Sequence, residues 1–146
     1  MATTNVAGCK SCTEGQYNDV EGSMLGCKNC PKGKYSASEK NAKDSDCQNC
    51  ISGKYSITLS AESISSCVDC IVSKYSESVG ATAESTCTLC VLGFEQKKPG
   101  MSYCLPCTPG KKGVADNGGY SICETCGNNF YSETTKSVRV CFFFSV

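Results

Sequence analysis

Cysteines recur along this chain at a regular spacing, and that spacing limits what it can fold into. Fifteen of the 146 residues are cysteine. Fourteen form seven C-x-x-C pairs, which follow one another in steps of 18, 20, 20, 20, 17 and 19 residues, with 18 more to the single Cys141. Such a density is typical of a disulfide scaffold or a metal-binding array, in which cross-links replace a large apolar core. The pairs are Cys9/Cys12, Cys27/Cys30, Cys47/Cys50, Cys67/Cys70, Cys87/Cys90, Cys104/Cys107 and Cys123/Cys126.

Other residues keep the same phase and define a repeat, C-x-x-G-x-Y-S followed by a polar stretch. The glycine suits a turn with positive φ, although Ser73 takes its place after the fourth pair. The tyrosine gives each small unit one large side chain, which can pack on a disulfide or on the next repeat. These residues are Gly15, Gly33, Gly53, Gly93, Gly110, Tyr17, Tyr35, Tyr55, Tyr75 and Tyr131.

The repeat predicts a small disulfide-rich fold, an elongated tandem array of short β-hairpin units with little helix and no central hydrophobic core. The K-Y-S segments alternate around an aromatic residue as strands do, and the polar stretches between them are typical of loops. Repeats of this kind contact mainly their neighbours and build a rod. We expect a polar segment over 1–8, repeats over 9–141 and an apolar tail over 142–146, with units at about 12–27, 30–47, 50–67, 70–87, 90–104, 107–123 and 126–141.

Charge and composition argue against several classes of function. Fourteen basic and fourteen acidic residues cancel, and no long run of either sign is present, so we expect no binding of nucleic acid. Histidine is absent, which removes the commonest general base and any Ser-His or Cys-His nucleophile pair within this chain. We therefore expect a chain that is not an enzyme and uses no cofactor. The apolar C-terminal segment is too short to span a bilayer, so we expect no membrane insertion by it.

Lysine recurs at the position before the tyrosine, as Lys34, Lys54 and Lys74. In a straight rod these three residues would form a basic stripe. The interpretation that we favour is a solvated strand edge, where lysine discourages aggregation.

Two chemistries explain tandem C-x-x-C pairs, namely disulfides in an oxidising compartment and four-cysteine zinc sites. Zinc sites would use the pairs two at a time, whereas the sequence repeats with a period of one pair. Zinc knuckles are usually accompanied by histidine or basic residues, and neither is enriched here. A thioredoxin-like oxidoreductase would need one such motif in an α/β domain and not seven copies. These observations favour disulfides, with an intracellular zinc-knuckle interaction protein as the alternative.

Two disulfide connectivities stay open, because sequence does not settle pairing. An interleaved scheme joins Cys9 to Cys27 and Cys12 to Cys30, continues in that way, and leaves Cys126 free. The other scheme joins the second cysteine of each pair to the next cysteine along the chain. It encloses one repeat per bridge and leaves only Cys9 unpaired, where a partner would lie in a preceding repeat. Its bridges are Cys12–Cys27, Cys30–Cys47, Cys50–Cys67, Cys70–Cys87, Cys90–Cys104, Cys107–Cys123 and Cys126–Cys141.

The segment C-K-N-C-P-K-G-K-Y-S over residues 27–36 resembles the cysteine-rich, epidermal-growth-factor-like repeats of ephrin receptors. More broadly it is similar to the growth factor receptor cysteine-rich superfamily, which includes tumour necrosis factor receptor modules and furin-like repeats. The resemblance covers about residues 9–141 and is specific from Cys30 to Cys87. It loosens beyond that point, where Phe94 stands one position early and Glu95 takes the tyrosine place. It implies extracellular, disulfide-bonded, non-catalytic modules that serve adhesion or ligand binding.

These observations together predict a non-catalytic extracellular segment of a larger secreted or cell-surface protein. It would serve as a stalk, an adhesion segment or a protein-ligand-binding module, and its partners would be a protein ligand or neighbouring repeats of the parent protein. Residues 1–8 lack the basic and apolar regions of a signal peptide, so we expect the chain to be a fragment.

Peptide mapping of the unreduced protein will distinguish the two connectivities. If each bridge encloses one repeat, mass spectrometry will find Cys12 linked to Cys27 and Cys30 linked to Cys47. A peptide that links Cys9 to Cys27 would instead show the interleaved scheme.

Overall fold

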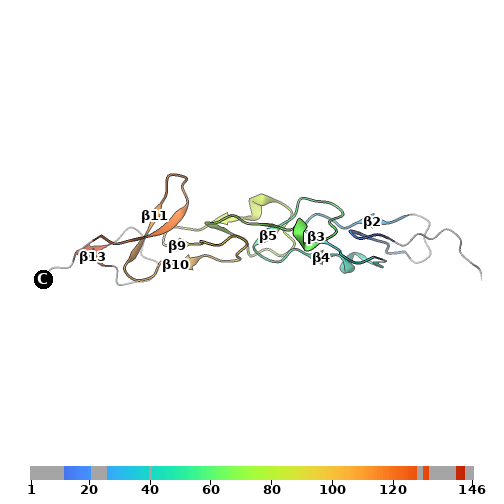
Figure 1. Ribbon diagram of the computed structural model, residues 1–146, viewed down its shortest axis with the longest axis horizontal. Coiled ribbons are helices and arrows are strands. Elements are labelled where there is room, and N and C mark those ends of the chain that lie inside the picture. The colour runs from blue at the N-terminus through green and yellow to red at the C-terminus, as the bar shows by residue number, and fades with distance from the viewer. Residues whose placement is uncertain (1–11, 21–25, 40, 128–129, 132–140, 144–146) are drawn as a thin grey trace, which may run out of the picture. The chain divides into compact units, whose positions relative to one another are not determined.

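The fold is built from very short strands that pair two by two (Figure 1). The computed structural model describes residues 12–20, 26–39, 41–127, 130–131 and 141–143. The pairing is antiparallel, with Tyr35 opposite Gln48 and Tyr75 opposite Thr88. Within the described residues the sheets are β1 (Gln16–Tyr17) with β2 (Lys28–Asn29), β3 (Lys34–Tyr35) with β4 (Gln48–Asn49), β5 (Lys54–Tyr55) with β6 (Val68–Asp69), β7 (Lys74–Tyr75) with β8 (Thr88–Leu89), β9 (Phe94–Glu95) with β10 (Leu105–Pro106), β11 (Lys111–Ala115) with β12 (Ser121–Thr125), and β13 (Phe130–Tyr131) with β14 (Phe142–Phe143).

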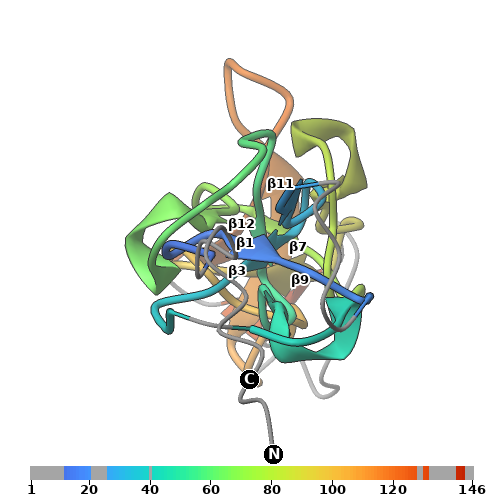
Figure 2. The ribbon, with the colours of Figure 1, turned by 90° about the vertical axis from the view of Figure 1, so that its right-hand side faces the viewer.

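Helix is confined to single 3-10 turns in the part of the chain that the structure describes. They lie just before the second cysteine of three loops, as η1 (Asp44–Asp46), η2 (Ile64–Ser66) and η3 (Glu84–Thr86). None of the described helices is long and apolar enough to cross a membrane. The longest hairpin in the described residues is that of β11 and β12, and its turn projects away from β9 and β10 (Figures 1 and 2).

Seven disulfides close the loops between these strands, and each encloses one copy of the repeat. They join the same cysteines as the scheme with one repeat per bridge, whereas Cys9 lies outside the described residues. The bridges are Cys12–Cys27, Cys30–Cys47, Cys50–Cys67, Cys70–Cys87, Cys90–Cys104, Cys107–Cys123 and Cys126–Cys141.

The interior consists of these bridges and of small side chains. Cys30 and Cys50 are 0% exposed, and the other buried hydrophobic residues in the described part are also cysteine or alanine. The repeated tyrosines with described side chains are only half-buried, while the serine after Tyr35, Tyr55 or Tyr75 is buried. The predicted fold class is therefore confirmed: a small disulfide-rich chain of hairpin units with little helix and no central hydrophobic core.

Contacts divide the chain into two compact units, each made of segments from several repeats. One unit combines Met1–Ile51, Tyr55–Val68 and Val79–Ala83. The other combines Ser52–Lys54, Asp69–Ser78 and Glu84–Val146.

In the first unit, each strand after a glycine turn is hydrogen-bonded on both sides. One side pairs with its own antiparallel partner, and the other meets the following repeat. The Gly33 amide donates to the Ser56 carbonyl at 2.9 Å, and the Ser36 amide donates to the Ala61 carbonyl at 2.9 Å. Tyr35 also forms a parallel bridge with Ala61. Successive repeats are thus joined by backbone hydrogen bonds as well as by the covalent chain.

The second unit contains the same pattern. The Gly53 amide donates to the Ser76 carbonyl at 2.7 Å, and the Ser73 amide donates to the Gln96 carbonyl at 2.7 Å. Ser73 adopts a φ of 63°, so serine here takes the left-handed conformation that glycine adopts in other repeats.

Glycine serves a second purpose that the turn alone does not reveal. Gly53 has a φ of 82°, and a Cβ added to it would lie 2.2 Å from the carbonyl oxygen of Gly100, two repeats further on. Gly33 meets Gly80 in the same way, again at 2.2 Å. The expectation that repeats contact mainly their immediate neighbours was therefore incomplete, because the glycine turns also receive the backbone of the second repeat along the chain.

Two glycine substitutions separate these two purposes. Gly110 has the same φ of 82° as Gly53 but nothing within 4 Å of an added Cβ. Gly110→Ala should cost about 1–2 kcal/mol of unfolding free energy, the price of a left-handed alanine. Gly53→Ala should cost about 1–3 kcal/mol more, because its methyl group also displaces backbone. Denaturant unfolding of the oxidised variants measures both, and equal losses would contradict the close approach.

Candidate binding surface

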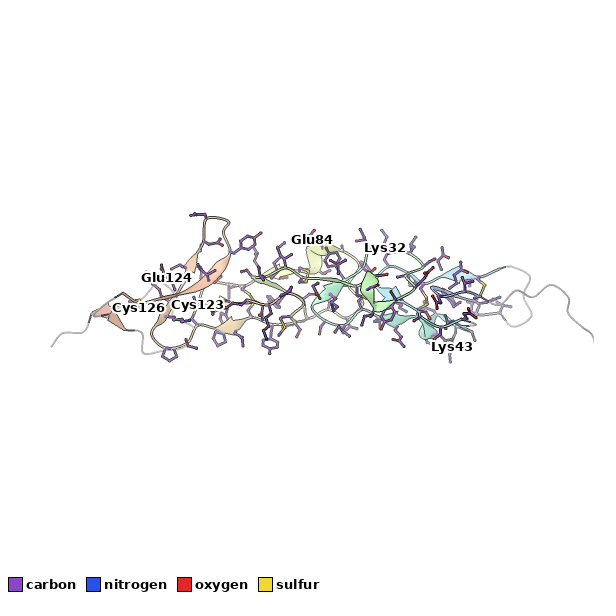
Figure 3. The ribbon with its side chains drawn as sticks, viewed as in Figure 1. Lys32, Lys43, Glu84, Cys123, Glu124 and Cys126 are labelled. Carbon is purple, nitrogen blue, oxygen red and sulfur yellow. A yellow bond between two sulfur atoms is a disulfide. The ribbon has the colours of Figure 1, made fainter. Side chains whose placement is uncertain are left out.

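Large apolar side chains lie on the outside of this scaffold because the bridges occupy its inside. Ile57 is 61% exposed, Val79 is 63% exposed and Val91 is 67% exposed. Charged side chains such as Lys32, Lys43 and Glu84 also project outward (Figure 3). Exposed apolar groups on a rigid frame are available for contact with another molecule.

The recurring lysines form ion pairs and not a free basic stripe. Lys34 Nζ lies 2.6 Å from a carboxylate oxygen of Asp44, and Lys74 Nζ lies 3.6 Å from one of Glu84. Ile64 stands at the corresponding place of the intervening loop, where it offers no charge. There Lys54 pairs with Asp69 of β6 instead.

Burial completes this correction of the favoured interpretation. The side chains of Lys34, Lys54 and Lys74 are only 24%, 24% and 21% exposed, so they are not a solvated strand edge. Each of these side chains is partly buried, and its ammonium group is paired with a carboxylate of the same loop or sheet.

A more exposed pair joins Lys28 to Asp19 at 2.7 Å. The hydrogen bond from the ammonium group lowers the pKa of Asp19, and it raises the pKa of Lys28. Because both side chains face solvent, this pair contributes little to stability.

One hollow in the second unit is lined by aromatic side chains. Tyr75, Phe94 and Tyr103 line it together with Val91, and the Glu77 side chain adds a carboxylate. Cys104 completes the lining. The volume of the hollow is about 240 Å³. Ligand pockets for drug-sized molecules are about 300–1,000 Å³, so this hollow has room for one side chain or a small ion and not for a large cofactor.

The hollow lies where the sequence repeat is irregular. The bridge Cys90–Cys104 spans 14 residues, whereas the three bridges before it span 17 each. Tyr103 directly precedes the closing cysteine and is 51% exposed. Phe94 takes the position that lysine occupies in the three preceding repeats.

Gln96 preserves the local turn despite these changes. It is 3% exposed at the position of the buried serines. Its Oε1 accepts a hydrogen bond from the Lys98 amide at 3.1 Å, as Ser76 Oγ does from the Ser78 amide at 3.3 Å. Its Nε2 also donates to the Tyr103 carbonyl at 2.8 Å, which ties the end of the short loop to its start.

Residues singled out from the sequence therefore have mainly structural places. The predicted glycines form turns, and Tyr17, Tyr35, Tyr55 and Tyr75 lie half-buried in short strands. Tyr131 lies in β13, where only the backbone is described.

Of these tyrosines, only Tyr75 lines the hollow. Sequence reasoning missed Glu77, Val91 and Tyr103 as lining residues. The signals that could have found the hollow were the short step of 17 residues between two cysteine pairs and the early aromatic residue Phe94.

The cysteine chemistry is also visible here. Among the residues that the structure describes, no group of three or more histidine, cysteine or acidic side chains is placed to hold a metal ion. Each described cysteine is bridged, so its sulfur is not a free thiolate ligand.

Comparison with known proteins adds no closer relationship, since no family model and no curated protein matches the chain. The resemblance to ephrin and tumour necrosis factor receptor modules therefore holds only at a general level. The structure shows a cysteine-rich, disulfide-bonded chain of tandem hairpin repeats. Such extensive disulfide bonding is characteristic of proteins outside the reducing cytosol.

The ion pairs predict weak binding to polyanions. The native chain should elute from a heparin column at low salt, because Lys34, Lys54 and Lys74 are already neutralised. A triple variant with Asp44→Asn, Asp69→Asn and Glu84→Gln frees these lysines and should elute at higher salt.

Net charge alone is controlled by a second triple variant, Glu14→Gln, Glu39→Gln and Glu62→Gln. It gains the same three units of charge at exposed carboxylates that form no ion pair within the described residues. It should shift less than the first variant. Equal shifts would show that the pairing of the lysines does not matter.

Proposed function

We propose that this chain is a non-catalytic, extracellular cysteine-rich repeat segment of a larger secreted or cell-surface protein that binds a protein ligand. The observation that carries the proposal is the pattern of one disulfide per repeat, which leaves apolar side chains outside. This role is the one that the resemblance to receptor cysteine-rich repeats implies, and a stalk or adhesion segment would present the same surface.

An extracellular location is supported by the dependence of the fold on its disulfide bridges. Each bridge closes 14 to 17 residues, which is worth about 3 kcal/mol in the chain-entropy description. Among the residues that the structure describes, the buried hydrophobic ones are cysteine and alanine, so little other apolar surface is removed from water there. Such a chain depends on an oxidising compartment, because reduction would remove both the cross-links and the buried core.

A binding role is supported by what the scaffold exposes. Ile57, Leu59 and Val79 are each more than half exposed. Their contact with water raises the free energy of the isolated chain relative to a state in which they are buried. Contact with a partner would remove this surface from water. The absence of histidine supports a role without catalysis, because it removes the side chain most often used as a general base near neutral pH.

Expression in two compartments tests the proposal. The chain made with a secretory signal should carry seven bridges, which remove fourteen hydrogens and lower the intact mass by about 14 Da relative to the reduced chain. The chain made in a reducing cytosol should be unfolded by circular dichroism.

The competing classes give other results in the same experiment. A cytosolic product that is folded and carries extra mass removable by a chelator would show the zinc-knuckle protein instead. Catalysis of insulin reduction by the secreted product would show an oxidoreductase and overturn the non-catalytic role.

A further inference from the structure

We infer that the aromatic hollow of the second unit binds an arginine side chain of a protein ligand. This inference rests on the proposed ligand-binding role and names the chemistry that one site would recognise. The hollow is formed by Tyr75, Phe94 and Tyr103, with Glu77 and Val91 at its wall.

The size and lining of the hollow favour a planar cation. Its volume of about 240 Å³ accommodates a single side chain. Three aromatic residues line it. A cation within about 6 Å of the centre of an aromatic ring is attracted to the face of that ring. A guanidinium group is flat, stacks on aromatic faces and is weakly hydrated, so it loses less than an ammonium group when it leaves water. Arginine therefore fits this lining better than lysine does.

Charge complementarity comes from Glu77. This residue is exposed, and within the described part of the chain its carboxylate forms no ion pair or hydrogen bond. Two other acidic residues of the second unit are already paired, since Glu84 pairs with Lys74 at 3.6 Å and Glu95 pairs with Lys97 at 3.0 Å. Glu77 thus adds a negative charge that no lysine within the described residues balances.

The hollow is held in place before any ligand arrives. The Phe94 carbonyl accepts a hydrogen bond from Ser121 Oγ at 2.6 Å, and the Tyr103 carbonyl accepts one from Gln96 Nε2 at 2.8 Å. Cys104, next to Tyr103, is bridged to Cys90. A preformed site loses less conformational entropy on binding than one that must be ordered.

A blocked glycine pentapeptide with one central arginine is the probe, titrated into the oxidised full chain and followed by NMR. The same peptide with citrulline, which keeps the shape but not the charge, is the control ligand. We expect saturable shifts at Tyr75, Phe94 and Tyr103 with the arginine peptide and much weaker binding of the citrulline peptide. Equal binding of both peptides would show that the hollow recognises shape or apolar surface and not a cation.

Variants of the lining test the geometry. Tyr103→Leu removes one ring and should weaken binding by about two- to fivefold, whereas Tyr103→Phe retains the ring and should bind as the native chain does. Glu77→Gln should weaken binding by about twofold or more and reduce its salt dependence. Glu62→Gln, at an exposed carboxylate in the first unit, is the matched control and should change nothing.

The outcomes distinguish this inference from the proposed function. Intact mass confirms seven bridges in each variant before titration, and Glu77→Gln carries the test if Tyr103→Leu does not fold. A bridged native chain that shows no saturable shift with the arginine peptide overturns the inference and leaves the extracellular role standing. A chain that is unbridged when secreted overturns the proposed function itself.

Discussion

One disulfide holds each loop of this chain, and the other features of the structure depend on that bond. A cystine fills the space where an ordinary domain places leucine or phenylalanine, so the interior is narrow. Segments from different repeats must then come close together, and only small groups fit between them. Gly53 meets Gly100 through the backbone, and buried alanine and serine take the remaining positions. Larger apolar side chains are left outside, where they are available to a partner.

The bridges alone do not order the loops, because a disulfide lowers the conformational entropy of the unfolded chain but does not specify the conformation of the folded one. That conformation is set by the backbone hydrogen bonds that run from each glycine turn to the next repeat, such as that from the Gly33 amide to the Ser56 carbonyl. These bonds need close approach of two backbones, which explains why glycine and serine recur in phase with the cysteines. The cross-links and the hydrogen bonds therefore act on different states, the first on the unfolded chain and the second on the folded one.

The cysteine register predicted the hairpin units and their lack of an apolar core, because a period of one pair matches one closed loop. It did not predict the contact of Gly33 with Gly80, since a positive φ already accounts for glycine in the sequence. Nor did it predict the partner of Lys54, because the acid lies on a strand in one repeat and on a 3-10 turn in others. The predicted elongation of the array stays a prediction.

The hollow was missed for a related physical reason. A repeat pattern identifies what every unit needs to fold, and it is silent about positions that a single unit uses differently. Between Cys90 and Cys104 the loop is shorter, Phe94 replaces lysine and Tyr103 precedes the closing cysteine. Gln96 nevertheless keeps the buried turn that serine makes elsewhere, so the scaffold is retained while its exposed lining changes. Because the other repeats keep the same turn without Phe94 and Tyr103, the shared scaffold does not account for these two residues, and it is in this repeat that we propose the arginine site.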